Sequence, residues 1–210
     1  MTDERRQQLI DTACAMNRSG INRGTAGNLS LRCGNGLLIT PSGRSYKELE
    51  PRDIVFIGPD GRFKGHGKPS SEWRIHYDIY RGRSDAAAIL HAHPTHCTAL
   101  ACMRQPIPPF HYMVAVAGGS DIPCASYATF GTQALSDNVL QALEGRKACL
   151  MANHGLLCLA KDLPGALALA VEIEQLAFAY MECLAVGPPV LLDDAEMDRV
   201  LERFKDYGAN

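Results

Sequence analysis

The chain has 210 residues, 46% of them hydrophobic, and its 21 basic and 23 acidic side chains leave a formal net charge of −2. This length is enough for one compact α/β domain with a full core, and we expect a single domain over residues 1–210. The charges form neither a basic stripe for a nucleic-acid backbone nor a polybasic membrane anchor. We therefore expect neither nucleic acid nor membrane as a partner.

Eight cysteines occur, mostly in apolar surroundings and never as Cys-x-x-Cys. Such spacing is typical of buried thiols in a reducing compartment, and not of a disulfide framework or a thiolate zinc site. No apolar signal segment follows Met1, and glutamates interrupt the longest apolar stretch, 166–186. We therefore expect a cytoplasmic protein in which this stretch is a buried helix.

Apolar periodicity and turn signals predict helices and strands along the whole chain. The expected helices cover residues 3–19, a segment that opens within 68–76 with Glu72 in its first turn, 95–103, 131–144, 163–186 and 193–204. The expected strands cover 29–31, 36–40, 53–58, an apolar run from 86 to the histidines before Pro94, 121–126, 148–152 and 156–160. Residues 111–119 fit a strand or a helix equally well.

The strand before Pro94 ends in His91-Ala92-His93. Side chains alternate along a strand, so His91 and His93 are expected on the same face, within reach of one small ion. Neutral imidazole is the commonest metal ligand, and we therefore favour a metal site over two histidines satisfied by hydrogen bonds. His154 is the third candidate, because a histidine in a turn between two buried strands is costly to place unless it has a function.

The other histidines are weaker candidates for the same ion. His96 could replace His93, but it is expected on the next helix, and His76 could pair with Glu72 across one helical turn. His66 and His111 are expected in loops or as supporting groups. Three imidazoles with one carboxylate would suit zinc, with manganese or cobalt as possible substitutes.

Small polar residues recur in three separated segments. They are Thr25 to Asn28 in a glycine-rich loop, Ser42-Gly43 in a turn, and Ser70-Ser71 before a helix. Backbone N–H groups in such loops and at helix N-termini, flanked by hydroxyl groups, can hold an anion. Together the segments predict a phosphate site with little cationic charge, since the chain has no P-loop and no dinucleotide-binding glycine pattern.

Several ordered blocks resemble the signature of the class II aldolase/adducin family, and especially its sugar-phosphate aldolases. The blocks are residues 24–28, 40–43, 70–74, 91–93, 111–113 and 154–155, and similarity extends from the first helix to residues 204–208. This resemblance implies a central, largely antiparallel β-sheet flanked by helices on both faces. It also implies a homotetramer with sites at subunit interfaces. One departure is Asn153, where the family's aldolases commonly have a second histidine.

The resemblance implies a role for each matching residue. It implies metal ligation by Glu72, His91, His93 and His154, with Glu72 also the catalytic acid/base, and phosphate binding by Thr25, Asn28, Ser42, Gly43, Ser70 and Ser71. Tyr112 would act, from a neighbouring subunit, on the hydroxyl of the carbon being cleaved. Tyr207, in a tail covering about residues 188–210, would line the aldehyde end, with Phe130 a weaker candidate.

The implied reaction is the zinc-dependent cleavage of a ketose 1-phosphate to dihydroxyacetone phosphate and a short aldehyde. L-Fuculose 1-phosphate and the 5-deoxy- and 5-methylthio-pentulose 1-phosphates all remain candidate substrates, because a hydroxyl or methylene in an apolar pocket changes specificity by only about 1–3 kcal/mol. The cation would stabilise the enediolate formed on cleavage, and Glu72 would supply the proton. No lysine lies in an apolar run, so Schiff-base chemistry is not expected.

Two other functions are possible on the same sequence. A pentulose-phosphate 4-epimerase or a methylthioribulose 1-phosphate dehydratase could use the same metal core, but the epimerases carry an acidic residue near the position of Tyr112. An adducin-like binding module could retain the fold with a vestigial site. The presence of Glu72 together with His91, His93 and His154 argues against this second possibility.

Overall fold

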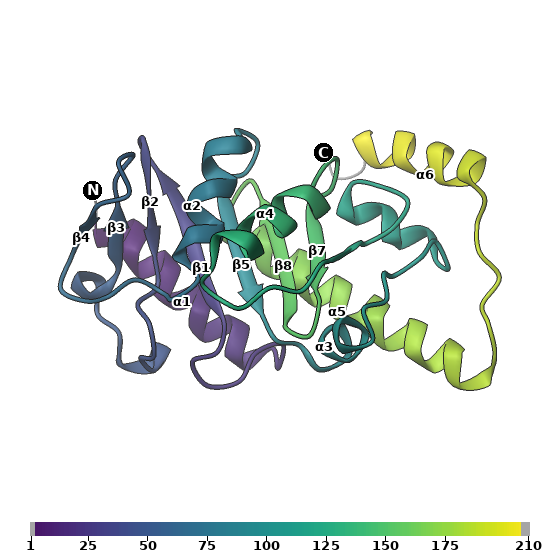
Figure 1. The fold of residues 1–210 in the computed structure, drawn as a ribbon, viewed down its shortest axis with the longest axis horizontal. Helices are drawn as coiled ribbons and strands as arrows, with labels where there is room; N and C mark the ends of the chain where they lie inside the picture. Colours follow the sequence, from purple (N-terminus) through teal and green to yellow (C-terminus); the bar gives the residue numbers. More distant parts are fainter. Residues whose placement is uncertain (1–2, 207–210) are drawn as a thin grey trace.

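A computed structural model describes residues 3–206 (Figure 1), so the expected role of Tyr207 falls outside the described residues. Within this range, eight strands form one sheet in the order β4-β3-β2-β1-β5-β8-β7-β6. All neighbouring strands are antiparallel except β6 and β7, which are parallel. The predicted α/β architecture with a largely antiparallel sheet is therefore confirmed.

The strands are short, and the central ones are apolar on both faces. Their bounds are β1 (Asn28–Cys33), β2 (Gly36–Ile39), β3 (Val55–Ile57), β4 (Phe63–Lys64), β5 (Ala88–Ala92), β6 (Cys124–Ala125), β7 (Ala148–Met151) and β8 (Gly155–Ala160). In β5, Ile89 packs into one core cluster and Leu90 into the other, which lies across the sheet. A strand covered on both faces needs such a continuous apolar run.

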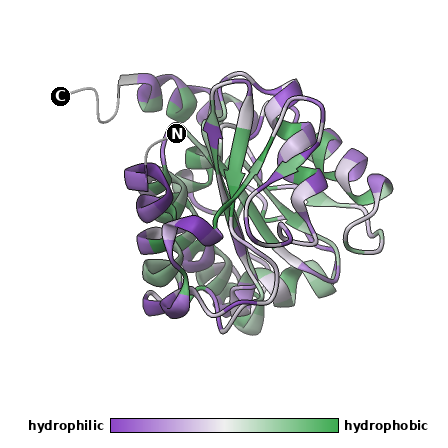
Figure 2. Ribbon diagram, turned by 90° about the vertical axis from the view of Figure 1, so that its left-hand side faces the viewer, coloured by the Kyte–Doolittle hydropathy of each residue, from purple (hydrophilic) through white to green (hydrophobic). Residues whose placement is uncertain are grey.

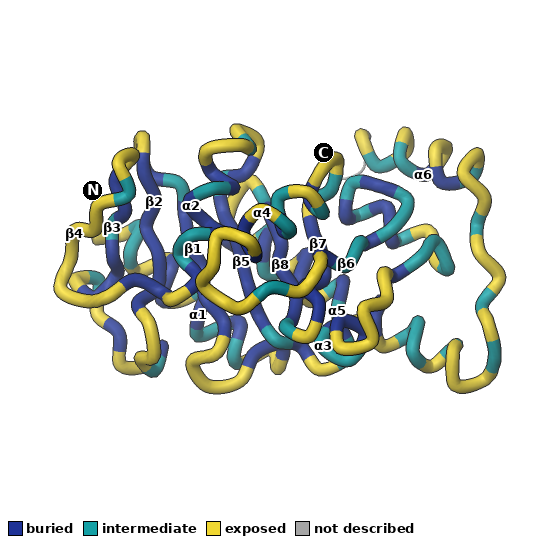
Figure 3. Tube along the Cα trace, viewed as in Figure 1, coloured by how far each residue is buried: buried dark blue, intermediate teal, exposed yellow. Residues whose placement is uncertain are grey.

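Helices cover both faces of the sheet, as expected. They are α1 (Asp3–Arg18), α2 (Trp73–Gly82), α3 (Thr95–Cys102), α4 (Gln133–Ala142), α5 (Leu163–Val186) and α6 (Asp194–Asp206), with 3-10 turns η1 (Tyr46–Glu48), η2 (Pro51–Asp53) and η3 (Tyr112–Ala117). The apolar faces of α1, α3 and α5 pack on one side and those of α2 and α4 on the other. Figure 2 shows hydrophobic residues concentrated along the sheet, and Figure 3 shows its strands largely buried.

Two expectations for local structure need correction. Helix α2 begins at Trp73, so Glu72 occupies the N-cap position and not the first turn. The Ser70 hydroxyl accepts a hydrogen bond from the Glu72 N–H at 3.2 Å, and this tight turn holds Glu72 outside the helix. Strand β6 is confined to Cys124–Ala125. Residues 111–119, for which periodicity gave no answer, contain the 3-10 helix η3.

The described part of the C-terminal segment packs against η3. Met197 and Val200 of α6 form a small buried cluster with Ala115, separate from the two main clusters. Helix α6 lies at the upper right of the molecule in Figure 1. None of the helices within residues 3–206 combines the length and apolar character needed to span a membrane.

Candidate metal centre

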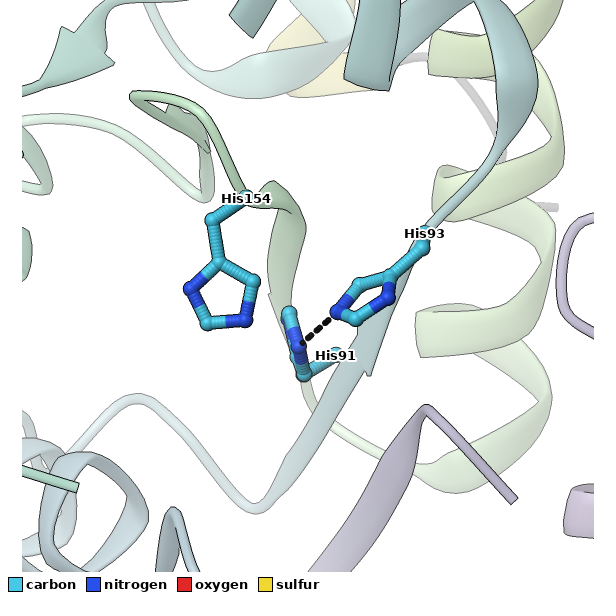
Figure 4. A group of neighbouring side chains, drawn as sticks. All are labelled: His91, His93 and His154. Carbon is cyan, nitrogen blue, oxygen red and sulfur yellow. Dashed lines mark hydrogen bonds between the residues drawn. The ribbon is translucent and has the colours of Figure 1, made fainter. Parts of the chain in front are cut away.

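Four polar side chains from three separate segments meet at one end of the central strands. His91 lies near the C-terminal end of β5 and His93 directly follows that strand. His154 lies in the turn between β7 and β8, and Glu72 directly precedes α2. The β5–β8 register pairs Ala92 with Leu156 and so brings the His154 turn beside β5. Figure 4 shows the three imidazole rings converging.

The distances between the side chains are short enough for one ion to contact all of them. The ligand atoms of His91, His93 and His154 all lie within 4.8 Å of one another, and the Nε2 atoms of His91 and His93 are 3.0 Å apart. The Glu72 carboxylate lies between two of the rings, with Oε2 3.1 Å from His91 Nε2 and Oε1 3.1 Å from His154 Nε2. The structure thus brings together all four expected ligands.

The hydrogen bonds around His91 identify which ring atom faces the centre. Its Nδ1 lies 2.9 Å from the carbonyl oxygen of Leu156, which can only accept, so Nδ1 carries a proton. In the neutral ring Nε2 then presents a lone pair to His93 and to the Glu72 carboxylate. Oε1 of Glu72 is buried and makes no well-aligned hydrogen bond. Such a group of electron-rich nitrogen and oxygen atoms fits a divalent cation.

Charge–charge interactions at this centre oppose the effect of burial. Burial alone would raise the pKa of Glu72, but His91 and His154 outweigh it and hold the pKa of this carboxyl well below its usual range. Burial would lower the pKa of His91, but Glu72 outweighs it and raises that pKa. Burial, His91 and His154 together lower the pKa of His93 to about 4. A proton and a metal ion therefore compete for the Nε2 atom of His91.

The three expected phosphate-binding segments lie side by side next to this centre. Ser70 N–H donates to Thr40 O at 3.0 Å and Ser42 N–H to Lys68 O at 3.1 Å, while Thr40 N–H donates to Leu29 O. The backbone N–H groups of Ser42 and Ser70 are thus already used within the chain. The six expected phosphate-binding residues differ in exposure. Thr25, Ser42, Gly43 and Ser71 are exposed, whereas Asn28 and Ser70 are buried.

A cavity of about 330 Å³ opens beside the centre. Its lining residues are Ala26, Ser71, Glu72, His93, Tyr127, Ala128, Phe130, Asn153 and His154. Phe130, the weaker candidate for the aldehyde end, thus lines this cavity, and Tyr127 lines it too. Tyr127 was missed in the sequence, where an aromatic residue in a loop gives no signal of its own. Tyr112 instead lines a separate hollow with Phe204 of α6.

The remaining histidines lie outside the cluster of ligands. His76 does not pair directly with Glu72, a possibility that ranked below His154 in the sequence, because Glu72 precedes the helix with non-helical backbone angles (φ −101°, ψ 15°). His76 contacts Asn28 and Ser30 instead. His96 lies on α3, as expected, and its Nδ1 is 2.8 Å from Glu174. His111 precedes η3, where its ring accepts the Met113 N–H.

The turn that carries His154 depends on close backbone contacts. A Cβ atom on Gly155 would lie 2.5 Å from the carbonyl oxygen of Ala92 and 2.8 Å from Cδ2 of His93. Asn153 has a left-handed backbone (φ 54°), and its side-chain oxygen accepts a hydrogen bond from Arg104 at 3.1 Å. Asparagine tolerates this conformation better than most residues. The Asn153-His154-Gly155 sequence thus allows the turn to approach β5.

The chain resembles known proteins in both sequence and fold. Residues 7–181 match the family described as Class II Aldolase and Adducin N-terminal domain. The chain is 54% identical to the 5-methylthioribulose-1-phosphate/5-deoxyribulose-1-phosphate aldolase of Rhodospirillum rubrum, over 98% of this chain and 93% of that protein. It is 50% identical to the L-fuculose phosphate aldolase of Escherichia coli K12, over 96% and 94% of the two chains.

The fold of the chain, like its sequence, is similar to that of known proteins. A solved structure of an L-fuculose 1-phosphate aldolase superposes with a TM-score of 0.95 and 41% identity, over 98% of both chains. The predicted family resemblance is therefore confirmed, and the chain belongs to the class II aldolase and adducin family.

Proposed function

We propose that the protein is a metal-dependent aldehyde-lyase that reversibly cleaves a ketose 1-phosphate to dihydroxyacetone phosphate and a short aldehyde. The observation that carries this proposal is the convergence of Glu72, His91, His93 and His154 beside a cavity. Relatives named as ketose 1-phosphate aldolases support the reaction class. The implied setting is carbohydrate metabolism in the cytoplasm.

The four converging side chains would hold the metal ion, for which we propose zinc, with manganese or cobalt as substitutes. Three imidazole nitrogens and one carboxylate oxygen are a donor set that zinc accepts. When bound, a divalent cation would stabilise the negative charge that develops on the substrate's oxygens as the carbon–carbon bond breaks. Glu72 is the only carboxylate of the four, and a carboxylate beside the cavity could exchange a proton with bound substrate, so we assign it the acid/base role.

The phosphate end of the substrate would meet the segments around Thr40. The hydroxyl groups of Thr25, Ser42, Ser70 and Ser71, with Gly43 and the Asn28 amide, are the proposed ligands. Gly43 has a left-handed backbone (φ 68°), which lets the chain turn sharply at the exposed Ser42-Gly43 position. These groups are neutral, so they would bind phosphate by hydrogen bonds and not by charge.

The aldehyde end of the substrate would lie toward Phe130 and Tyr127. Relatives at 54% and 50% identity are named for different ketose 1-phosphates, so a 5-deoxy- or 5-methylthio-pentulose 1-phosphate and L-fuculose 1-phosphate are all candidate substrates. An apolar wall distinguishes a methyl from a methylthio or hydroxyl substituent by only about 1–3 kcal/mol. We therefore expect overlapping activity on all three.

We further propose a homotetramer in which Tyr112 serves the centre of a neighbouring subunit. In one protomer Tyr112 is 51% exposed and lines a hollow with Met113, Val200, Arg203 and Phe204. It is absent from the residues that line the cavity beside Glu72. An exposed tyrosine of this kind could reach a second copy. Tyr207, which lies outside the described residues, would line the aldehyde end.

A product assay over the three candidate ketose 1-phosphates tests the proposal. The protein, loaded with zinc, is expected to release dihydroxyacetone phosphate, which glycerol-3-phosphate dehydrogenase reduces with consumption of NADH. Release from none of them would refute the reaction class. Chromatography of the remaining sugar would then identify an epimerised or dehydrated product, and the absence of stoichiometric metal would indicate a binding module.

A further inference from the structure

A chain of buried polar side chains leads from the core to the Glu72 carboxylate. Its members come from β1 and α2 and include Asn28, Ser30, His76 and Tyr80. Ser30 and His76 are 0% exposed, Asn28 is 3% exposed and Tyr80 is 7% exposed. Burying this many polar groups is costly unless every one of them is hydrogen-bonded.

Consecutive members of the chain are within hydrogen-bond distance. Asn28 Nδ2 donates to Glu72 Oε2 at 3.0 Å, and Asn28 Oδ1 lies 2.6 Å from His76 Nε2. On the other side of the ring, His76 Nδ1 lies 2.6 Å from the Ser30 hydroxyl. The Ser30 hydroxyl in turn lies 2.9 Å from the Tyr80 hydroxyl.

The chemistry of the groups determines the direction of every bond. An ionised Glu72 can only accept, so Asn28 must present its N–H₂ group to it and its oxygen to His76. That oxygen accepts, and the proton of the His76 ring must therefore be on Nε2. Burial lowers the pKa of His76 to about 3, so the ring is neutral and its Nδ1 accepts from Ser30. Ser30 then accepts from Tyr80.

We infer that His76 is a positioning residue for Glu72, because its Nε2–H group holds the Asn28 amide in the orientation that donates to the carboxylate. An asparagine amide is nearly symmetrical in shape, so packing alone does not select between its two orientations. The reversed orientation would point Asn28 Oδ1 at Glu72 Oε2, and two acceptors would repel. A donor at His76 Nε2 disfavours that orientation from the other side of Asn28 as well, because it would then face the Asn28 N–H₂ group.

The effect of His76 on catalysis rests on the proposed function. Its effect on the orientation of Asn28 rests on hydrogen bonding alone. A histidine that merely filled the core could be replaced by any side chain of similar shape. A histidine that orients Asn28 can be replaced only by a side chain with a donor at the position of Nε2. Glutamine and methionine have similar length and volume, and only glutamine carries a donor there.

The matched variants His76→Gln and His76→Met test the inference through activity. We expect His76→Met to lower kcat by about 10- to 100-fold, the usual range for loss of a group that supports a metal ligand. KM should change less, because His76 contacts only Asn28 among the six proposed phosphate ligands. His76→Gln should recover most of the lost kcat. Equal kcat values for the two variants, at equal thermal stability, would overturn the inference.

A spectroscopic test gives an answer without any substrate. Long-range ¹H–¹⁵N correlation spectra of the histidine-labelled protein should show His76 with its proton on Nε2 and a bare Nδ1 at neutral pH. Ser30→Ala removes the donor to Nδ1 and should shift the signals of this ring while leaving those of His96 unchanged. A His76 ring protonated on Nδ1, alone or on both nitrogens, would refute the inference. Failure of every ketose 1-phosphate to react would refute the proposed function and leave this result standing.

Discussion

His91 donates a hydrogen bond from Nδ1 to the carbonyl oxygen of Leu156, 2.9 Å away on the neighbouring strand. The pairing of β5 with β8, in which His91 lies opposite Leu157, therefore sets the tautomer and the ring orientation of this ligand. Ligating histidines commonly depend on such a partner for their other ring nitrogen. The register of the central strands and the chemistry of the centre are thus linked through one backbone carbonyl.

Replacement of Glu72 and of His93 should separate catalysis from metal binding. Glu72→Gln keeps an oxygen donor and three imidazoles, so we expect most of the metal to remain while turnover is lost with the acid/base group. His93→Ala removes a nitrogen ligand and should lose both metal and turnover. Metal analysis by mass spectrometry and the dihydroxyacetone phosphate assay measure the two properties. Unchanged activity in Glu72→Gln would contradict its proposed role.

Substitution of Gly155 should damage the centre although the residue carries no ligand. A Cβ atom in Gly155→Ala would meet Ala92 O at 2.5 Å and the His93 ring at 2.8 Å, so the His154 turn must move away from β5. We expect weaker metal binding and a lower melting temperature. The control is Gly82→Ala at the end of α2, where a Cβ meets nothing within 4 Å. Full metal content in Gly155→Ala would show that the turn has more freedom than these contacts allow.

The helices could largely be predicted because their signals are local. Helix α5 covers Leu163–Val186, the predicted range, because Asp162 caps its first turn through Gly165 N–H and a glycine follows its end. The start of α2 was misjudged, since several serines near it could each serve as a cap. Which serine forms the turn depends on the contact of Ser70 with Thr40, from another part of the chain.

In the site too, local features could be predicted from the sequence and long-range contacts could not. His91 and His93 could be placed on one face because alternation along a strand is a property of neighbouring residues. The contact of His76 with Asn28 spans 48 positions and has no local pattern. It depends on β1 and α2 packing together, which the sequence does not reveal through periodicity. Long-range hydrogen bonds of this kind therefore required the structure.

Removal of the metal should lower stability as well as abolish activity. The buried His91 and Glu72 side chains form a site that the unfolded chain lacks, so bound metal stabilises the folded state. At a free metal concentration of about 100 times Kd, this linkage contributes about 2.7 kcal/mol. Scanning calorimetry before and after dialysis against a chelator should show a lower melting temperature, restored by zinc. An unchanged melting temperature would argue against a stoichiometric ion.

Stability at low pH should depend on Asp53. The Glu50 N–H bond, and then Arg44 at 2.6 Å, lower the pKa of this carboxyl despite its burial. A carboxyl whose folded-state pKa is below its unfolded value stabilises the fold above the unfolded value, and the contribution is lost as pH falls through the folded value. Asp53→Ala should therefore cost about 1 kcal/mol at neutral pH, as for loss of a helix cap.

That cost should shrink as the pH falls below the ordinary carboxyl pKa. Urea unfolding of Asp53→Ala and of the parent at several pH values measures it. The control is Asp198→Ala, at an exposed position on α6, which should change stability little at any pH. A cost for Asp53→Ala that is the same in acid as at neutral pH would show that packing, and not the charge, carries the effect.

The proposed sharing of sites between subunits can be tested by complementation. Tyr112→Phe and His93→Ala, expressed separately, should each have little activity, because the first lacks the tyrosine and the second lacks the metal. If Tyr112 serves a neighbouring subunit, mixed oligomers contain some sites with His93 from one subunit and Tyr112 from another.

Co-expression with two different affinity tags, followed by sequential purification, isolates these oligomers. They should recover a measurable part of the parent's kcat with unchanged KM. If Tyr112 acted within its own subunit, every mixed site would lack one of the two groups, and the mixed oligomers would be no more active than the separate variants.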